Sequence, residues 1–405
     1  MLRSRRFRLL ALLFVFSLVA AACGDDDSPG GQTAEVKGWD VEAEDGLFTG
    51  SFTDMALARS TAETLLDENA DMILAVGGAI NLPAGDAIRE RELDAALIGV
   101  DVDAFNAMDE QYQDLWLTTI EKDLAGYVTD AIAAHATGTW APGFRVGTLA
   151  NEGVGLAPYH SWEDKVPEEL ASEVEEVKAS IIAGDIEAAT YDPTFGGGEP
   201  LPEVDAEGGE ATPVKACLVT DLAGVDDRSF NASAWQGVQD AVEAGYATED
   251  STFLESDAAE DWQPNIDNFL SQDCEHIVTV GFALGEVTDL NAAANPDINW
   301  TMVDNVLETQ HDNVVQNVYQ TDEAAFLAGY IAASVTETGV VGTFGGANFP
   351  TVSIFMNGFY WGVQAYNEAK GDDVQVLGWD PEIQDGLFTG DFVDLDRARA
   401  TAQSL

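Results

Sequence analysis

The stretch VKACLVTDLAGVDDRSFNASAWQGVQ, residues 214–239, joins an apolar run to an amphipathic run through a short polar loop. Its first eight residues are rich in apolar and β-branched side chains, which is typical of a buried parallel strand. Over 231–245 the spacing of apolar residues predicts a helix that ends on a glycine. Ligands of open α/β sheets bind beyond the carboxyl ends of strands, so the loop is a candidate ligand site. It contains Asp221, Asp226, Asp227, Ser229, Phe230 and Asn231.

Strand and helix patterns alternate along most of the chain. A helix is predicted over 54–70, where an aspartate in the capping position precedes apolar residues at helical spacing. This alternation predicts doubly wound α/β lobes. A linker rich in Gly, Pro and Glu, residues 191–213, divides the chain into a first part, 37–190, and a second part, 214–405. Further runs typical of buried parallel strands are ADMILAVGG (70–78), AALIGVD (95–101), HIVTVG (276–281) and VQVLGWD (374–380).

Nearly the same segment occurs close to both ends of the chain. GWDVEAEDGLFTGSFTDMALARSTAETL, residues 38–65, and GWDPEIQDGLFTGDFVDLDRARATAQSL, residues 378–405, are identical at 17 of 28 aligned positions. The offset of 340 residues approximates one domain plus a linker. A tandem duplication trimmed at both ends, a gene fragment and an error of sequence assembly would each leave this arrangement, and the residues do not distinguish them.

The first residues have the pattern of a secretory signal. A basic start, MLRSRRFR, precedes an apolar run over 9–22, which is shorter than the ~20 residues that a membrane-spanning helix needs. Small residues then precede Cys23, and a flexible acidic tether continues the chain over 24–36. We interpret 1–23 as a bacterial lipoprotein signal, with a lipidated Cys23 that anchors an extracytoplasmic protein to the cell membrane. The alternative is an ordinary secretory signal with an incidental cysteine.

Acidic residues outnumber basic residues 73 to 17, which gives a net charge of −56. Such a surface repels phosphate backbones, and this excludes nucleic acid as a partner. The charge is explained by solubility, for example in salty water, or by the attraction of a cation. The four histidines show no pair at metal-ligand spacing, and the sequence has no phosphate-binding loop with lysine and no nucleophile elbow. We therefore expect no metal, no cofactor and no enzymatic activity.

The motif TD-x-x-G-x-DD-x-SFN-x-x-AW-x-G within 214–239 resembles the opening of the basic membrane protein (Bmp) family. The resemblance continues through VGFALGEVT, MVDN, VGTFGG and VSIFMNGFYWGV to VLGWD. The phrases NADMILAVGGA, LIGVDVD and LTTIEK in the first part resemble the later segments of family members, so the two halves stand in reversed order. The family consists of extracytoplasmic lipoproteins that serve ABC transporters, and several bind nucleosides. The resemblance implies a fold like that of the type I periplasmic binding proteins, with a ligand cleft between two Rossmann-like lobes.

The reversed order places the chain break inside the second lobe. Two copies of the GWD strand and its adjoining helix then compete for one position. We expect intramolecular closure, in which the N-terminal copy wins through its continuity with residues 66–78. The alternative is pairing with another molecule, as in domain swapping. Circular permutation is tolerated where the termini of a compact domain lie close together.

Aromatic and polar residues of the motif loop are candidates for holding a base. Phe230 offers a stacking face for a flat ring, and the resemblance suggests Phe355 for the second face. Asp227 and Asn231 offer groups that can bind the edge of a purine. The alternatives are helix capping for the loop residues and helix packing for Phe355.

Residues at other expected strand ends are candidates for holding a sugar. The resemblance implies that Asp101 accepts from ribose hydroxyls, and that Lys122 donates to the sugar or balances Asp101. The alternatives are a solvated loop position for Asp101 and a surface ion pair for Lys122. The remaining candidates at strand ends are a carboxylate and three glycines that would let a ligand approach the backbone: Asp304, Gly77, Gly78 and Gly281.

Cys217 and Cys274 precede or lie in predicted neighbouring strands. An oxidising compartment permits a disulfide between them, and two buried free thiols are the alternative. The sequence thus predicts a lipid-anchored protein that captures a nucleoside and delivers it to an ABC-transporter permease. The alternatives are a surface lipoprotein or rearranged relic without ligand binding, and an enzyme that acts on nucleosides.

Overall fold

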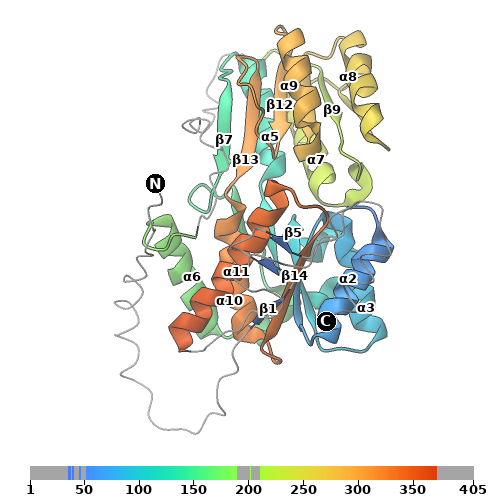
Figure 1. Cartoon of the computed structure of the whole chain (residues 1–405). Coiled ribbons are helices and arrows are strands. Elements are labelled where there is room, and N and C mark those ends of the chain that lie inside the picture. Colours follow the sequence, from blue (N-terminus) through green and yellow to red (C-terminus); the bar gives the residue numbers. More distant parts are fainter. Residues whose placement is uncertain are drawn as a thin grey trace, which may run out of the picture.

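The computed structural model describes residues 52–188, 201 and 210–371, together with the short strands β1 (Glu35–Lys37), β2 (Trp39–Asp40) and β3 (Asp45–Gly46). These residues form two α/β lobes that lie one above the other in Figure 1. The expected signal over 1–23, most of the linker over 191–213 and the tail from residue 372 lie outside the described residues. Within the described part of the chain, no helix is long and apolar enough to span a membrane.

The first lobe, at the top of Figure 1, contains a parallel sheet with the strand order β10-β9-β11-β12-β13-β7. Strand β7 comes from the first part of the sequence, whereas its neighbour β13 and the other strands come from the second part. The strands are β7 (Gly143–Gly147), β9 (Ala216–Val219), β10 (Thr252–Leu254), β11 (His276–Val280), β12 (Asn299–Val303) and β13 (Val314–Tyr319). The helices are α5 (Leu124–Thr137), α7 (Phe230–Glu243), α8 (Trp262–Ser271) and α9 (Gly285–Ala294).

The second lobe contains a sheet with the strand order β1-β14-β4-β5-β6-β8, in which only β8 is antiparallel to its neighbour. The strands after β1 are β14 (Val340–Gly345), β4 (Met72–Val76), β5 (Ala96–Asp101), β6 (Trp116–Lys122) and β8 (Val154–Leu156). The helices are α2 (Met55–Asp67), α3 (Asn81–Glu90), α4 (Ala104–Ala107), α6 (Glu168–Ile182), α10 (Thr321–Val335) and α11 (Pro350–Lys370).

Both sheets therefore combine strands from the two parts of the sequence. Their mostly parallel strands, which alternate with helices along the chain, confirm the predicted α/β fold with two lobes. Strand β14 from the second part lies between β1 and β4 from the first part. Strand β1 occupies the position beside β14 and directly precedes the GWD segment of the N-terminal copy of the repeat. The backbone of Glu35 and Val36, at the end of the predicted tether over 24–36, pairs with β14.

Local signals explain why the predicted helices form where they do. The side chain of Asp54 accepts from the backbone N–H groups of Ala56 (3.1 Å) and Leu57 (3.0 Å), which begins α2 inside the predicted range. Helix α7 ends at Glu243, and Gly245 lies just beyond it with φ 78°. This left-handed conformation suits glycine and confirms the predicted helix end.

The chain crosses between the lobes at three described places: from β6 to α5, from β7 to β8 and from β13 to α10. Backbone hydrogen bonds join these crossings. The N–H of Gln320 donates to the carbonyl of Gly147 (2.7 Å), and the N–H of Asp123 donates to the carbonyl of Gly153 (3.0 Å). These bonds fix the relative position of the strand ends at the boundary between the lobes.

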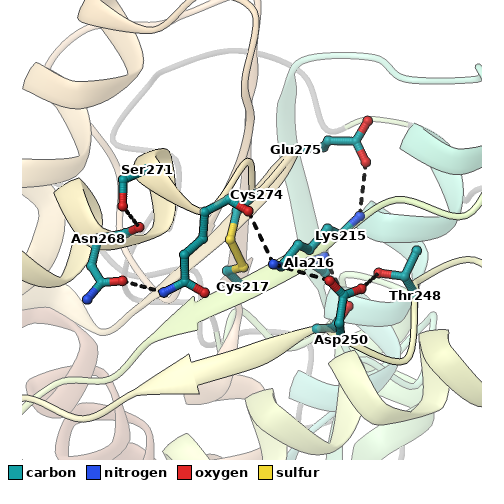
Figure 2. The surroundings of a disulfide bond; sticks show 11 residues. Lys215, Ala216, Cys217, Thr248, Asp250, Asn268, Ser271, Cys274 and Glu275 are labelled. Atoms are coloured by element: carbon teal, nitrogen blue, oxygen red, sulfur yellow. Dashed lines mark hydrogen bonds and ion pairs between the residues drawn. A yellow bond between two sulfur atoms is a disulfide. The ribbon is translucent and has the colours of Figure 1, made fainter.

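Cys217 of β9 and Cys274, just before β11, form a disulfide with a Cα–Cα distance of 6.1 Å. Both cysteines are fully buried in the first lobe. Figure 2 shows Lys215, Asp250 and Glu275 around this bond. Lys215 pairs with Asp250 at 3.2 Å, and its backbone N–H donates to Glu275 at 3.1 Å. Because Lys215 lies just before β9, the disulfide is at the end of the sheet away from the carboxyl ends of the strands.

Candidate functional site

A buried lysine stands where the carboxyl ends of strands from both sheets meet. Lys122 ends β6 of the second lobe and is only 5% exposed. Its Nζ lies 2.8 Å from Oδ2 of Asp304, which comes directly after β12 of the first lobe. The same Nζ lies 3.7 Å from Oδ1 of Asp101, which ends β5. One cation therefore faces two carboxylates, one from each lobe.

Asp101 and Asp304 share the same backbone conformation and the same degree of burial. Each has a left-handed backbone, with φ 71° for Asp101 and 59° for Asp304, and each is 6% exposed. Burial raises the pKa of Asp101, and Asp304 raises it further, while Lys122 acts in the opposite direction. A non-glycine residue in this conformation at a strand end is uncommon, and such strain is concentrated at functional sites.

Three aromatic rings surround the ammonium group of Lys122. Its Nζ lies 4.7 Å from the ring centre of Phe355, 5.6 Å from that of Phe230 and 5.7 Å from that of Tyr319. The structure thus brings together two predicted aromatic residues, the predicted lysine and two predicted aspartates. The sequence motifs do not predict Tyr319, although it ends β13 just as Lys122 ends β6. Its position at a strand end is the signal that could have identified it.

The motif loop is held by hydrogen bonds within the first lobe. The carboxylate of Asp227 accepts from the backbone N–H groups of Ser229 (3.0 Å), Asn231 (2.7 Å) and Ala232 (3.0 Å), as a capping residue does. The amide Nδ2 of Asn231 donates to Asp221 (2.7 Å) and Asp227 (2.9 Å). Asp227 and Asn231, which were predicted to bind the edge of a purine, therefore make hydrogen bonds within the loop itself in this conformation.

Asp221 and Ser229 are two further polar residues that lie next to the predicted site residues. Burial raises the pKa of Asp221 to about 6, even though Ala223 and Asn231 donate to its carboxylate. Ser229 Oγ, in the first lobe, donates to Oδ2 of Asp101 in the second lobe at 3.0 Å. Asp221 therefore changes charge in a mildly acidic range, and Ser229 ties the motif loop to the second lobe.

The predicted glycines lie at close approaches. A Cβ on Gly78 (φ 58°) would lie 3.3 Å from the Cβ of Ser229 in the other lobe. A Cβ on Gly281 (φ 98°) would lie 3.2 Å from the Oδ2 atom of Asp221. Gly77 faces Phe52, which a Cβ would approach to 2.7 Å. Gly78 thus permits the lobes to meet, and Gly281 borders the motif loop.

A cavity of about 280 Å³ reaches the buried pair of Asp101 and Lys122 from the second lobe. Burial raises the pKa of Glu121 in its wall, and Asp103 adds to this effect. Carboxylates predominate in the lining, so the cavity disfavours anionic solutes. The lining residues are Asp101, Val102, Asp103, Glu121, Lys122, Asp123, Glu152 and Gly155.

The sequence also led us to expect no metal site and a lipid anchor on Cys23. Among the described residues, no group of three or more His, Cys, Asp or Glu side chains could hold a metal ion. Cys23, the predicted site of lipidation, lies outside the described residues.

Comparison with known proteins identifies several partial relatives. The ABC transporter nucleoside-binding protein BmpA of Lactococcus lactis subsp. cremoris is 33% identical over 169 residues, which are 41% of this chain and 48% of that protein. Basic membrane protein A of Borreliella burgdorferi is 27% identical over 179 residues, which are 44% and 48% of the two chains. A solute-binding protein of an ABC transporter system from Aeropyrum pernix K1, of known structure, is 28% identical with a TM-score of 0.36, and the match covers 40% of this chain and 46% of that one.

The chain spans about half the length of the curated relatives it matches. A model of the family described as ABC transporter substrate-binding protein PnrA-like matches residues 47–191 and 214–381. These two segments cover more than half of the chain and confirm the resemblance seen in its motifs. The chain belongs to the PnrA-like, or Bmp, family of ABC transporter substrate-binding proteins.

Proposed function

We propose that this protein captures a nucleoside, most readily a purine nucleoside, between its two lobes and delivers it to the permease of an ABC transporter. The observation that carries the proposal is the position of Lys122. This buried cation contacts an aspartate from each lobe inside a group of three aromatic rings. A closing cleft with these groups has the parts that a small polar ligand with one flat ring requires.

The chemistry of the site favours a nucleoside over a nucleotide. Phe230 and Phe355 supply faces on which a base can stack. Asp101 can accept from two sugar hydroxyls, and Lys122 can donate to the sugar. Carboxylates outnumber the single lysine in this group, so a phosphate would meet net repulsion. The relative from Lactococcus lactis is itself named a nucleoside-binding protein.

The remaining parts of the proposal concern the order of the chain and its location. We take 37–190 as the C-terminal half and 214–405 as the N-terminal half of one Bmp-type domain, joined in permuted order by the linker at 191–213. The protein would act outside the cytoplasm, held to the membrane by a lipid on Cys23, and would perform no covalent chemistry. The mixed strand order of both sheets supports closure into one binding unit.

Isothermal titration calorimetry tests the ligand. The solutes are adenosine, inosine, guanosine, cytidine and uridine, with guanosine monophosphate as the charged comparison. We expect heat from at least one nucleoside and a weaker response to the monophosphate.

Asp101→Asn should weaken binding about 10- to 100-fold, because hydrogen bonds to a charged group contribute ~1.5–3 kcal/mol each. Asp250→Asn is the matched control, since Asp250 is a surface residue that pairs with Lys215 beside the disulfide. The absence of heat with every nucleoside would remove the ligand assignment.

A further inference from the structure

Three phenylalanine rings, different from the rings around Lys122, form a row where the lobes meet. Phe282 lies just after β11 in the first lobe, and Phe349 precedes α11 in the second lobe. Their ring centres are 4.9 Å apart and their planes differ by 27°, so the rings of the two lobes stack on each other. Phe52 continues the row at 6.0 Å from Phe349. All three side chains are partly exposed, which places the row at the surface of the contact between the lobes.

The row is continuous with the walls of the ligand site. Gly281, the residue before Phe282, lies against Phe230, since a Cβ there would be 3.5 Å from the Phe230 ring. Helix α11 begins directly after Phe349 and carries Phe355, whose ring lies over Lys122. The stacked pair therefore adjoins the residues that carry the two aromatic faces of the proposed site.

The second-lobe end of the row has a rigid support. Phe52 packs so closely on Gly77 and Gly346 that a Cβ on either glycine would collide with its ring. Phe349 rests on Phe52, whereas Phe282 comes from the opposite lobe. Separation of the lobes therefore has to break the contact between Phe282 and Phe349, while Phe52 and Phe349 can move together.

We propose that Phe282 and Phe349 form an aromatic gate over the ligand site. The rings part when the lobes open and stack again when they close, so the pair controls the rates of ligand entry and release. This inference rests on the proposed function, because it concerns access to the same site. The gate differs from the ligand contacts in that its rings face each other.

A gate has a kinetic signature that a ligand contact lacks. An offset aromatic pair stabilises its closed arrangement enough to change an opening equilibrium roughly two- to tenfold. If the stack closes the free protein as well as the complex, its loss speeds both association and dissociation. The dissociation constant then changes less than either rate. Loss of a direct ligand contact instead raises the dissociation rate and the dissociation constant together.

The test uses the full chain with Phe282→Leu, Phe349→Leu and the double substitution. Leucine keeps an apolar side chain but cannot stack. Phe253→Leu is the matched control, because Phe253 packs on Trp235 at 5.0 Å within the first lobe. Stopped-flow measurement with the best nucleoside from the calorimetry gives both rates. We expect each single variant to speed both rates roughly two- to tenfold, the double variant to add little, and the control to match the wild type.

A second readout needs no ligand. Amide hydrogen exchange of the motif loop, residues 221–231, should be faster in ligand-free Phe349→Leu than in wild type or the control. If no nucleoside binds, the proposed function fails while this measurement still decides whether the stack holds the lobes closed. Unchanged exchange in the loop, or a dissociation constant that rises in proportion to the dissociation rate, would overturn the gate. Melting curves confirm that each variant is folded.

Discussion

Lys122→Met removes the cation between Asp101 and Asp304 while keeping a long unbranched side chain. Removing one partner of a buried charge pair costs ~3–5 kcal/mol, because the remaining charge has no compensation. Lys122 faces two carboxylates at 2.8 and 3.7 Å, so we expect the upper half of this range. With an unfolding entropy of ~2.1 cal/mol/K per residue over roughly 300 residues, the melting temperature should fall by about 6–8 °C.

The size of the loss should depend on pH. Burial already raises the pKa of Asp101, and without Lys122 the pKa should rise further. A carboxyl with a raised pKa in the folded state contributes stability at low pH that is lost as pH increases through that pKa. The variant should therefore be less impaired at pH 5 than at pH 8. Differential scanning calorimetry at both values measures this difference.

Lys215→Met is the matched control for this experiment. Lys215 pairs with Asp250, whose side chain is 69% exposed, and solvent screening leaves such a surface pair with little effect on stability. A melting temperature of Lys122→Met equal to that of the control at both pH values would refute the reasoning. It would mean that the carboxylates at the cleft do not depend on the buried cation.

Three further variants test other parts of the structure. Asp221→Asn should reduce the decrease in melting temperature between about pH 4 and 6. The raised pKa of about 6 gives Asp221 a stabilising effect at low pH, and this effect is lost as the pH rises over the interval. An unchanged profile of melting temperature against pH would contradict this. Replacing Cys217 and Cys274 with serine should cost about 4 kcal/mol in a urea titration, from the entropy of the 57-residue loop that they close, and no change would argue against the bond. Asp71→Ala should cost about 3 kcal/mol in the same assay, because Asp71 accepts three hydrogen bonds from residues 336–338 and so joins the two parts of the chain; a neutral effect would show that this junction is weak.

Much of the fold could be predicted because its signals are local. The apolar runs over 70–78, 95–101 and 276–281 contain β4, β5 and β11. The main site residues could be predicted from their position at strand ends, because the carboxyl ends of parallel strands lie at one edge of a sheet. This is why Asp101 and Lys122, although 21 positions apart, meet at the cleft.

Features that depend on pairing across the whole chain could not be read from one segment. The position of β7 beside β13 joins residues far apart in the sequence, and its pattern GFRVG is short and interrupted by an arginine. Tyr319 belongs to no motif that indicates a ligand. The role of Asp227 was ambiguous for a physical reason, since the same carboxylate can cap a helix or bind a solute, and only the loop geometry shows which N–H groups it contacts.

A crystal structure of the protein grown with inosine or guanosine tests the central claim most directly. The account predicts density for one nucleoside among Phe230, Phe355 and Lys122, with its sugar hydroxyls on Asp101, and β14 between β1 and β4. A nucleoside bound elsewhere, or Phe230 and Asp101 on units that do not face each other, would contradict it.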